Sequence, residues 1–245
     1  MSKVKSYAAL QADKPLHPHD INRRDINPDD VNIDILYCGV CHSDIHMARN
    51  EWNNTSIYPM VPGHEIIGIV KEVGSTVTKF KVGDNVGVGV YVDACEKCDN
   101  CNSGKDHYCE EGIVLTYNSY EYGTKNITYG GYSKSIVVKE NYVIKVPSEM
   151  DMKKAAPLLC AGITTYSPLR HFKINSNHKV GIAGLGGLGH MGLKFASSFG
   201  ADVVVFSTSD SKKDEAFEMG ANHFVNVNNS KDVRKHMNSC DYILD

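Results

Sequence analysis

Short apolar runs between turn residues, rather than long amphipathic stripes, dominate the first part of the chain. Val/Ile-rich segments recur between Gly, Pro and Asp turns at Val31–Tyr37, Ile66–Val73 and Val86–Val92. The segment KVGDNVGVGVYV alternates and carries many glycines, which suits a curved sheet better than a helix. We therefore predict a barrel-like β domain over residues 1–150.

The pattern changes at about residue 151, where helix-like and strand-like segments begin to alternate. A helix-like stretch over residues 152–169 comes first, and further helix-like segments separate the strands that follow. We expect four short strands, at Val180–Ala183, 201–207, 223–227 and 241–245. Such alternation indicates a parallel α/β sheet. A complete doubly wound domain has about six strands, so we expect residues 151–245 to form a C-terminally truncated one.

Composition narrows the functional classes. An apolar share of 42% is ordinary for a globular protein, and a formal net charge of -3 shows no bias toward nucleic acid or an anionic membrane. The first residues lack a secretory apolar region, and no apolar run reaches the roughly 18 residues of a membrane span. We expect a soluble, cytoplasmic protein, in which the eight cysteines are more often metal ligands than disulfides.

Four cysteines lie in the segment CEKCDNCNSGKDHYC, with the spacing C-x2-C-x2-C-x7-C. Four thiolates this close in sequence can close a tetrahedral shell on a structural zinc ion. An iron–sulfur cluster and unmetallated thiols are the alternatives, although the long last gap and the missing proline speak against the cluster. We predict a structural zinc lobe at about residues 93–112. Its ligands would be Cys95, Cys98, Cys101 and Cys109.

A second group of metal-binding residue types, Cys41, His64, Glu65 and Cys160, is scattered in sequence. Taken singly, Cys160 could be a small buried hydrophobe and His64 a satisfied turn histidine. The Pro-Gly turn at residues 62–63, however, can aim both side chains that follow it inward. Two thiolates and one imidazole form the Cys2His set of a catalytic zinc, which leaves a fourth position for water or substrate.

The segment GLGGLG satisfies G-x-G-x-x-G between an apolar strand and a helix, which is the context that a dinucleotide-binding turn requires. A plain tight turn is the alternative. Glycines in this context let backbone N–H groups approach a pyrophosphate at the start of the helix. We predict cofactor contacts from Gly184, Leu185, Gly186, Gly187, Leu188 and Gly189.

The strand after this turn ends at Ser207, where NAD enzymes usually carry Asp or Glu to hold the ribose 2′-hydroxyl. Without that carboxylate, a 2′-phosphate is not repelled. Thr208, Ser209 and Lys212 add hydroxyl donors and a cation, although a solvated helix face is the alternative for Lys212. Asp210 could be a helix N-cap or a weak ribose ligand. The pattern favours NADP(H) over NAD(H).

The segments YCGVCHSDIH, PGHE, the four-cysteine lobe, LLCAGITTYSPL and GLGGLGHMG follow one another along the whole chain. In these motifs the chain resembles the zinc-containing medium-chain alcohol dehydrogenases, most closely the cinnamyl alcohol dehydrogenase-like branch. The resemblance implies a GroES-like domain at residues 1–150 and a partial Rossmann domain at residues 151–245. It also implies an NADP-dependent enzyme that transfers hydride between NADP(H) and a primary alcohol or aldehyde.

The resemblance further implies the catalytic metal set. Cys41, His64 and Cys160 would ligate a catalytic zinc, and Glu65 would enter the coordination shell in some states. With the four-cysteine lobe, this makes two zinc ions per chain. Asp44 matches the carboxylate that orients His64.

Three more residues match family positions near the reaction. Ser43 matches the hydroxyl that contacts the cofactor and takes the alcohol proton, and His46 matches the group that relays the proton by way of the cofactor ribose. Thr164 matches a position near the nicotinamide. Local turn capping is the alternative for Ser43 and Asp44, and a solvated surface position is the alternative for His46. Cys38 has no matching ligand role, and we expect it to pack.

Two other functions compete with this one. A zinc-free quinone reductase-like relative would lack the complete ligand set found here. A zinc-binding remnant without full activity is the second, because later family segments complete the Rossmann sheet and the nicotinamide pocket. The family's dimer contacts also lie in those later segments, which speaks against a homodimer here. No nucleic-acid or membrane partner is expected.

Overall fold

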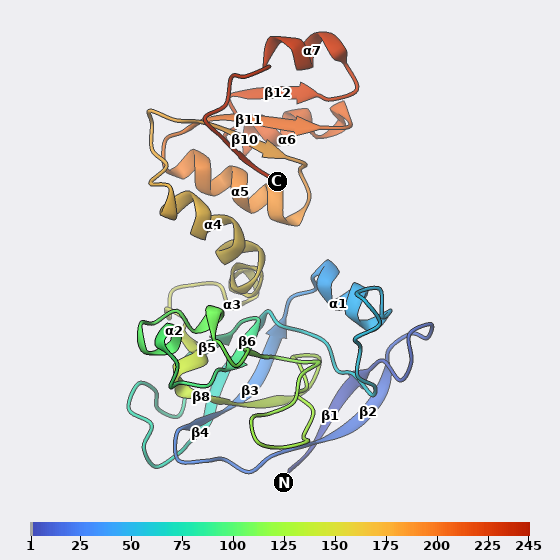
Figure 1. The fold of residues 1–245 in the computed structure, drawn as a ribbon, viewed down its shortest axis with the longest axis vertical. Coiled ribbons are helices and arrows are strands. Elements are labelled where there is room, and N and C mark those ends of the chain that lie inside the picture. The colour runs from blue at the N-terminus through green and yellow to red at the C-terminus, as the bar shows by residue number, and fades with distance from the viewer. Residues whose placement is uncertain (1) are drawn as a thin grey trace. The chain divides into compact units, whose positions relative to one another are not determined.

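The computed structural model describes residues 2–245 and divides the chain into two compact units, Met1–Cys160 and Ala161–Asp245 (Figure 1). Each unit has a hydrophobic core of its own. No helix within residues 2–245 is long and apolar enough to cross a membrane.

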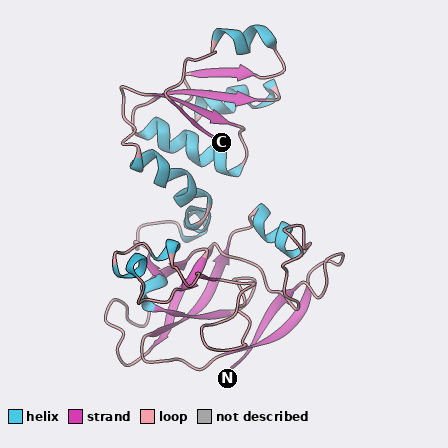
Figure 2. Cartoon of the chain, in the orientation of Figure 1, coloured by secondary structure: helices cyan, strands magenta, loops and turns pink. Residues whose placement is uncertain are grey.

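The first unit is built on a five-stranded antiparallel sheet with the strand order β8-β3-β4-β5-β9 (Figure 2). Its strands are β3 (Asp30–Cys38), β4 (Ile66–Val73), β5 (Asn85–Val88), β8 (Ser135–Lys139) and β9 (Val143–Lys145). Two smaller sheets pair β1 (Ser2–Ala8) with β2 (His17–Arg23) and β6 (Tyr91–Asp93) with β7 (Val114–Leu115). The predicted β-rich first domain is confirmed.

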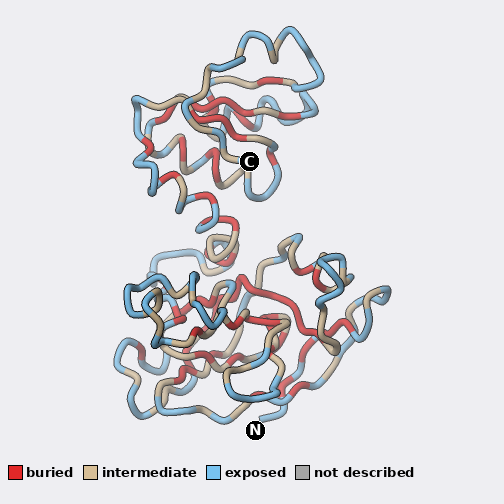
Figure 3. Tube along the Cα trace, in the orientation of Figure 1, coloured by how far each residue is buried: buried red, intermediate tan, exposed pale blue. Residues whose placement is uncertain are grey.

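Alternation of buried residues explains how the central sheet forms its core. Val31 and Ile33 on β3, Val86 and Val88 on β5, and Ile136 on β8 are all buried in one cluster. The pairing of β3 with β4 shifts register at two points, which marks irregularities that bend a strand. Figure 3 shows the buried stretches of these strands in red.

The single strand expected at Val86–Val92 is instead two strands, β5 and β6. The chain leaves the central sheet after Val88, and the backbone N–H of Thr116 then donates to the Val90 carbonyl at 2.9 Å. This bond lies directly beside the separate pairing of β6 with β7. The strand that pairs with this apolar segment therefore changes partway along it. The alternation of apolar and polar residues does not reveal that change.

Short helices complete the first unit. They are α1 (His42–Ala48), α2 (Asp99–Asn102) and α3 (Met152–Ala155), with single 3-10 turns η1 (Asp106–Tyr108), η2 (Glu140–Tyr142) and η3 (Ala156–Leu159). The helix-like stretch at 152–169 is broken, because Cys160 has φ -128° and ψ -77° and separates η3 from the helix that follows. Ala155 and Ala156 pack with Ile67 and Val146 of the first unit. Residues 151–160 thus belong to the first unit by their contacts, whereas the sequence pattern assigns them to the second.

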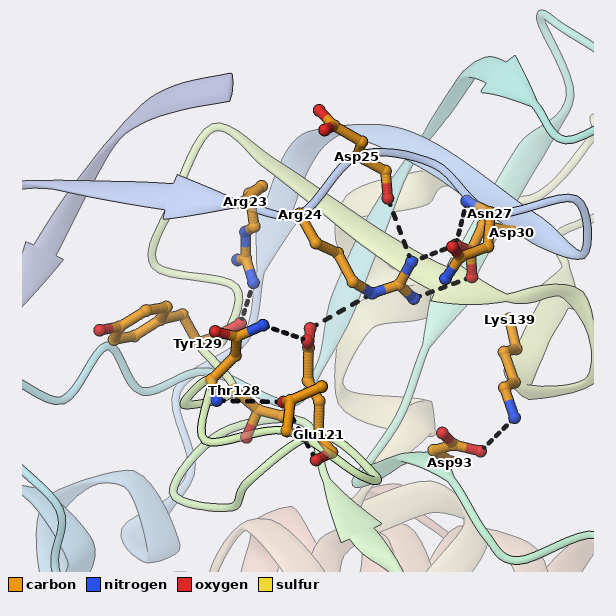
Figure 4. Close-up of polar contacts among 12 residues, drawn as sticks. Arg23, Arg24, Asp25, Asn27, Asp30, Asp93, Glu121, Thr128, Tyr129 and Lys139 are labelled. Atoms are coloured by element: carbon orange, nitrogen blue, oxygen red, sulfur yellow. Dashed lines mark hydrogen bonds and ion pairs between the residues drawn. The ribbon is translucent and has the colours of Figure 1, made fainter. Parts of the chain in front are cut away.

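Two adjacent arginines hold the long loop between β7 and β8 (Figure 4). Arg24 lies between the buried carboxylate of Asp30, which it contacts through both Nη atoms, and Glu121, whose Oε1 is 3.2 Å from Arg24 Nε. Buried Arg23 donates from Nη1 to the carbonyl of Tyr129 at 2.6 Å. These bonds tie Glu121 and Tyr129 to the end of β2, and Tyr129 precedes the segment that leads into the site described below.

The second unit is a four-stranded parallel sheet with the order β12-β11-β10-β13. Its strands are β10 (Lys179–Ala183), β11 (Asp202–Ser207), β12 (His223–Asn226) and β13 (Tyr242–Leu244). Its helices are α4 (Ala161–His171), α5 (Gly187–Ser198), α6 (Lys213–Glu218) and α7 (Ser230–Lys235), with the 3-10 turn η4 (Asp210–Lys212). The four predicted strands and their parallel pairing are confirmed.

The core of the second unit lies on β10 and β11, which are buried over most of their length (Figure 3). Val180, Ile182, Val203 and Val205 pack there with Leu193 of α5. Near-continuous apolar runs are typical of parallel strands, because helices cover such sheets. This packing places the carboxyl ends of β10, β11 and β12 at one edge of the sheet.

Candidate functional site

The first candidate site begins where β3 ends and α1 starts. Cys41 is the N-cap residue of α1, and Asp44 sits in the first turn with only 2% of its surface exposed. The backbone N–H of Cys41 donates to Asp44 Oδ2 at 3.0 Å. Buried Met47 anchors the same short helix beside Met60. Asp44 and Met47 of the same helix therefore fix the position of its first turn, and with it the thiol of Cys41.

Asp44 also binds the turn that carries the next two candidate ligands. The backbone N–H of Gly63 donates to Asp44 Oδ1 at 2.9 Å, and His64 Nδ1 lies 3.0 Å from the same oxygen. Tyr132 donates its hydroxyl to Asp44 Oδ2 at 3.2 Å. Burial has the largest single effect and raises the pKa of the Asp44 carboxyl, but His64 and the backbone N–H groups of Cys41 and Gly63 together lower it overall. The bond at Nδ1 leaves His64 Nε2 for a metal ion.

Glycine is required at two places around this turn. Gly63 has φ +104°, and a Cβ there would meet Cys38 Sγ and Tyr132 at 2.8 Å. At Gly39, a Cβ would lie 1.8 Å from Oε2 of Glu65. The chain therefore leaves room for the Glu65 carboxylate, which is buried next to His64.

The ligand atoms of Cys41, His64, Glu65 and Cys160 all lie within 4.8 Å of one another. The two sulfurs are 3.9 Å apart, and two thiolates at about 2.3 Å from a tetrahedral zinc would be separated by about 3.8 Å. All four residues belong to the first unit. The donor set and its spacing therefore fit one zinc ion, and the structure brings together every ligand proposed from the sequence.

The proposed proton-transfer residues lie on the same helix. Ser43 Oγ is 3.6 Å from Cys41 Sγ. His46 is partly exposed, yet its Nδ1 is 2.5 Å from Glu51 Oε2, and its ring stacks on Trp52 with centroids 5.4 Å apart. Contacts with Glu51 and Trp52 therefore fix the orientation of the partly exposed His46 ring.

The four-cysteine lobe forms a second metal-binding geometry. Cys95, Cys98, Cys101 and Cys109 place their sulfurs within 4.8 Å of one another, and Cys95 Sγ is 3.8 Å from Cys101 Sγ. That separation also matches two thiolates on a tetrahedral zinc. Between Cys95 and Cys109 the chain forms only α2 and η1, of four and three residues. The lobe thus has the closed, four-thiolate donor set of a structural zinc.

Cys38 belongs to neither group. It packs against the core of the central sheet, and burial raises the pKa of its thiol to about 12. Cys38 therefore packs against the core and lies outside both groups of candidate metal ligands.

In the second unit, the glycine-rich turn joins β10 to α5. Gly184 has φ +81°, and a Cβ at Gly189 would lie 2.0 Å from the Gly184 carbonyl oxygen. At Gly186 and Gly187, a Cβ would meet nothing within 4 Å. The outer two glycines are therefore needed for the turn itself, whereas the middle two leave the backbone open. A dinucleotide pyrophosphate needs such an approach at the helix start.

The two leucines of this turn differ in what they can offer a cofactor. The side chain of Leu185 is buried in the core of the second unit, whereas that of Leu188 is exposed. Leu185 can therefore contact a cofactor only through its backbone, and its carbonyl already accepts a hydrogen bond from Lys212 Nζ at 2.7 Å. Thr164 lies exposed on α4.

The end of β11 carries the predicted 2′-phosphate loop. Ser207 is buried, and its Oγ bonds within the loop to the carbonyl of Ser209. Ser209 is the N-cap of η4, where its side chain accepts from the Ser211 N–H. Asp210 is thus not the cap, which was one of its two alternatives. Thr208 and Lys212 lie in the same loop as Asp210, and Ser207 at the strand end is not a carboxylate.

Sequence reasoning missed the partners of these residues. Tyr132 and Glu51 hold Asp44 and His46, yet neither side chain belongs to a recognisable metal or cofactor motif. Tyr132 lies 88 positions from Asp44. Only the fold brings Tyr132 and Asp44 together, whereas Glu51 lies just five positions after His46.

Family comparisons agree with this geometry. A family model described as "Alcohol dehydrogenase GroES-like domain" matches residues 27–148, and one described as "Zinc-binding dehydrogenase" matches residues 187–245. The aldehyde reductase YahK of Escherichia coli is 50% identical over 243 residues, which are 99% of this chain and 69% of that protein. An NADP-dependent alcohol dehydrogenase C of Mycolicibacterium smegmatis is 50% identical over all of this chain and 70% of its own length.

Solved structures give the same result. A cinnamyl alcohol dehydrogenase of Sorghum bicolor is 41% identical with a TM-score of 0.95, over 99% of this chain and 69% of that one. A CAD of Helicobacter pylori, complexed with NADP(H), is 49% identical with a TM-score of 0.87, over 91% of this chain and 64% of that one. The chain therefore spans about 70% of the length of the two curated relatives above.

Proposed function

Since the chain belongs to the zinc-containing medium-chain alcohol dehydrogenase family, we propose that it transfers hydride between NADP(H) and a primary alcohol or aldehyde. The convergence of Cys41, His64, Glu65 and Cys160 around one point carries this proposal. A quinone reductase-like relative without zinc would have no need of such a set.

The proposed chemistry divides between the bound groups and the chain. When bound, zinc supplies a Lewis acid for the substrate oxygen, and NADP(H) supplies the hydride carrier. Cys41, His64 and Cys160 would hold the metal, with Glu65 as an exchangeable ligand. Asp44 would keep the His64 ring in the orientation and tautomer that present Nε2.

Proton movement is assigned to α1. We propose that Ser43 Oγ takes the proton from the alcohol and that His46 releases it to solvent. Glu51 accepts from His46 Nδ1 at 2.5 Å, so the other ring nitrogen is the one left to exchange a proton. The remaining cysteines, Cys95, Cys98, Cys101 and Cys109, would hold a second, structural zinc.

We propose that the second unit binds NADP(H) in preference to NAD(H). The turn from Gly184 to Gly189 would receive the pyrophosphate. Ser207, Thr208, Ser209 and Lys212 would receive the 2′-phosphate, and Thr164 would lie near the nicotinamide. Support comes from the absence of a carboxylate at the end of β11, where an NAD enzyme usually has one. Two of the relatives described above are named or solved with NADP(H).

The proposal is tested by the oxidation of NADPH, followed at 340 nm, with an aromatic and a medium-chain aldehyde. We expect turnover that requires zinc and is faster with NADPH than with NADH. Cys160→Ser should lower the rate at least about 100-fold, whereas Cys240→Ser, which lies outside both metal groups, should not.

Two results would contradict the proposal. Turnover that survives Cys160→Ser unchanged would favour a zinc-free, quinone reductase-like enzyme. Binding of two zinc ions and NADPH without turnover would favour the zinc-binding remnant.

A further inference from the structure

One carboxylate does lie in the loop that follows β11. Asp210 is the first residue of η4, three positions after Ser207. Left free, a carboxylate here would repel a 2′-phosphate, which carries between one and two negative charges at neutral pH. The same carboxylate could accept a hydrogen bond from the ribose 2′-hydroxyl of NAD(H). The position of the Asp210 side chain therefore bears directly on the choice of coenzyme.

Asn226 holds that carboxylate. It is the last residue of β12, and its Cα is paired with that of Ser207 at the carboxyl ends of two neighbouring parallel strands (Figure 1). Asn226 Nδ2 donates to Asp210 Oδ2 at 2.9 Å. The strand register thus places an amide donor beside the residue where NAD enzymes usually bind the ribose.

The orientation of the Asn226 amide is fixed by its other end. The backbone N–H of Asn228 donates to Asn226 Oδ1 at 3.0 Å, so the NH2 group must be the one that faces Asp210. Asn228 Nδ2 in turn donates to the carbonyl of Thr208 at 2.9 Å. The segment after β12 therefore holds both the backbone of the loop and its one carboxylate.

We propose that Asn226 is a specificity-determining residue for the coenzyme, because it holds the Asp210 carboxylate away from the 2′-phosphate site. This inference rests on the NADP(H) preference proposed above. Without Asn226, Asp210 is released toward the site, where it opposes the 2′-phosphate and accepts from a 2′-hydroxyl. The coenzyme preference then shifts toward NAD(H) with no change at Ser207, Thr208 or Lys212.

The experiment measures dissociation constants of NADPH and NADH for the whole chain by isothermal titration calorimetry. Asn226→Ala should raise the NADPH constant about tenfold, the effect of one weakly screened like charge, and leave the NADH constant equal or lower. Adding Asp210→Asn to Asn226→Ala should restore NADPH binding, because the repelling carboxylate is gone. Asn177→Ala, at an exposed asparagine of the same unit, is the matched control.

Four results would overturn the inference. Equal weakening of NADPH and NADH by Asn226→Ala would show that Asn226 only supports the loop. If Asn226→Ala leaves the preference for NADPH unchanged, Asn226 is not a determinant. The same conclusion follows if adding Asp210→Asn to Asn226→Ala does not restore NADPH binding. Both results would leave the proposed function intact. A preference for NADH in the unmodified chain would overturn the proposed coenzyme and this inference together.

Discussion

At the scale of single residues, Asp44 is the side chain on which the candidate metal centre depends. Its two oxygens accept from Cys41 N–H, Gly63 N–H and Tyr132 Oη, and one of them pairs with His64 Nδ1. His64 and the backbone donors lower the pKa of this buried carboxyl, and so favour its charged form. It links α1 to the Pro-Gly turn, and so positions three of the four candidate ligands at once.

We therefore predict that Asp44→Asn weakens zinc binding at this centre by about 10- to 100-fold, the usual effect of losing a partner behind a metal ligand. The amide cannot accept from all four donors, because its NH2 group is itself a donor. Competition with a chromophoric chelator measures the affinity. Asp34→Asn, at an exposed carboxylate paired with Lys71, is the control. An unchanged zinc affinity in Asp44→Asn would contradict the role given to Asp44.

The sequence suggests the residues that carry chemistry more readily than the residues that hold them. Cys41, His64 and Cys160 stand in recognisable segments, and the structure brings them together. Tyr132 and Asn226 stand in none. Tyr132 reaches Asp44 through the loop that Arg23 and Arg24 hold, and Asn226 reaches Asp210 through the register of β11 and β12. The local sequence pattern predicts neither arrangement.

At the scale of elements, the turn between β10 and α5 depends on glycine for packing as well as for binding. Gly189→Ala would place a Cβ 2.0 Å from the Gly184 carbonyl oxygen. Because that atom belongs to the backbone, the turn itself must shift. We predict a loss of about 1–3 kcal/mol in unfolding free energy, together with loss of NADPH binding.

Urea unfolding followed by circular dichroism measures this change. Gly187→Ala is the matched control, because a Cβ there meets nothing within 4 Å and alanine is the better helix former. Its unfolding free energy should stay equal or rise slightly. If both variants have the same stability, the close contact at Gly189 is not what fixes the turn.

The bounds of a strand or helix can be predicted from the sequence where the whole apolar segment packs within a single sheet or helix. Ile66–Val73 is β4 with the predicted bounds, because all of it pairs within one sheet. The run at Val86–Val92 is divided between two sheets, and the helix-like stretch at 152–169 is interrupted at Cys160. In both cases, tertiary partners decide where the element ends.

At the scale of the whole molecule, two units with separate cores carry separate candidate ligand sites. The β-rich unit and the α/β unit were predictable because period-2 runs give way to alternating strands and helices. The strand order in each sheet was not, since residues far apart in sequence decide it. Both metal clusters lie in Met1–Cys160, and the glycine-rich turn lies in Ala161–Asp245.

This separation predicts two local responses in hydrogen exchange measured by mass spectrometry. Removal of zinc by a chelator should speed exchange most in residues 93–112, where short elements surround the four cysteines and little apolar core remains. NADPH should slow exchange most between Gly184 and Lys212, because a ligand protects the amides that it contacts and the elements that it stabilises. Cys98→Ser should reproduce the first response and leave the second intact. If chelation instead exposed β10 and β11 as strongly as the lobe, or if NADPH protected the lobe most, the assignment of one ligand type to each unit would be wrong.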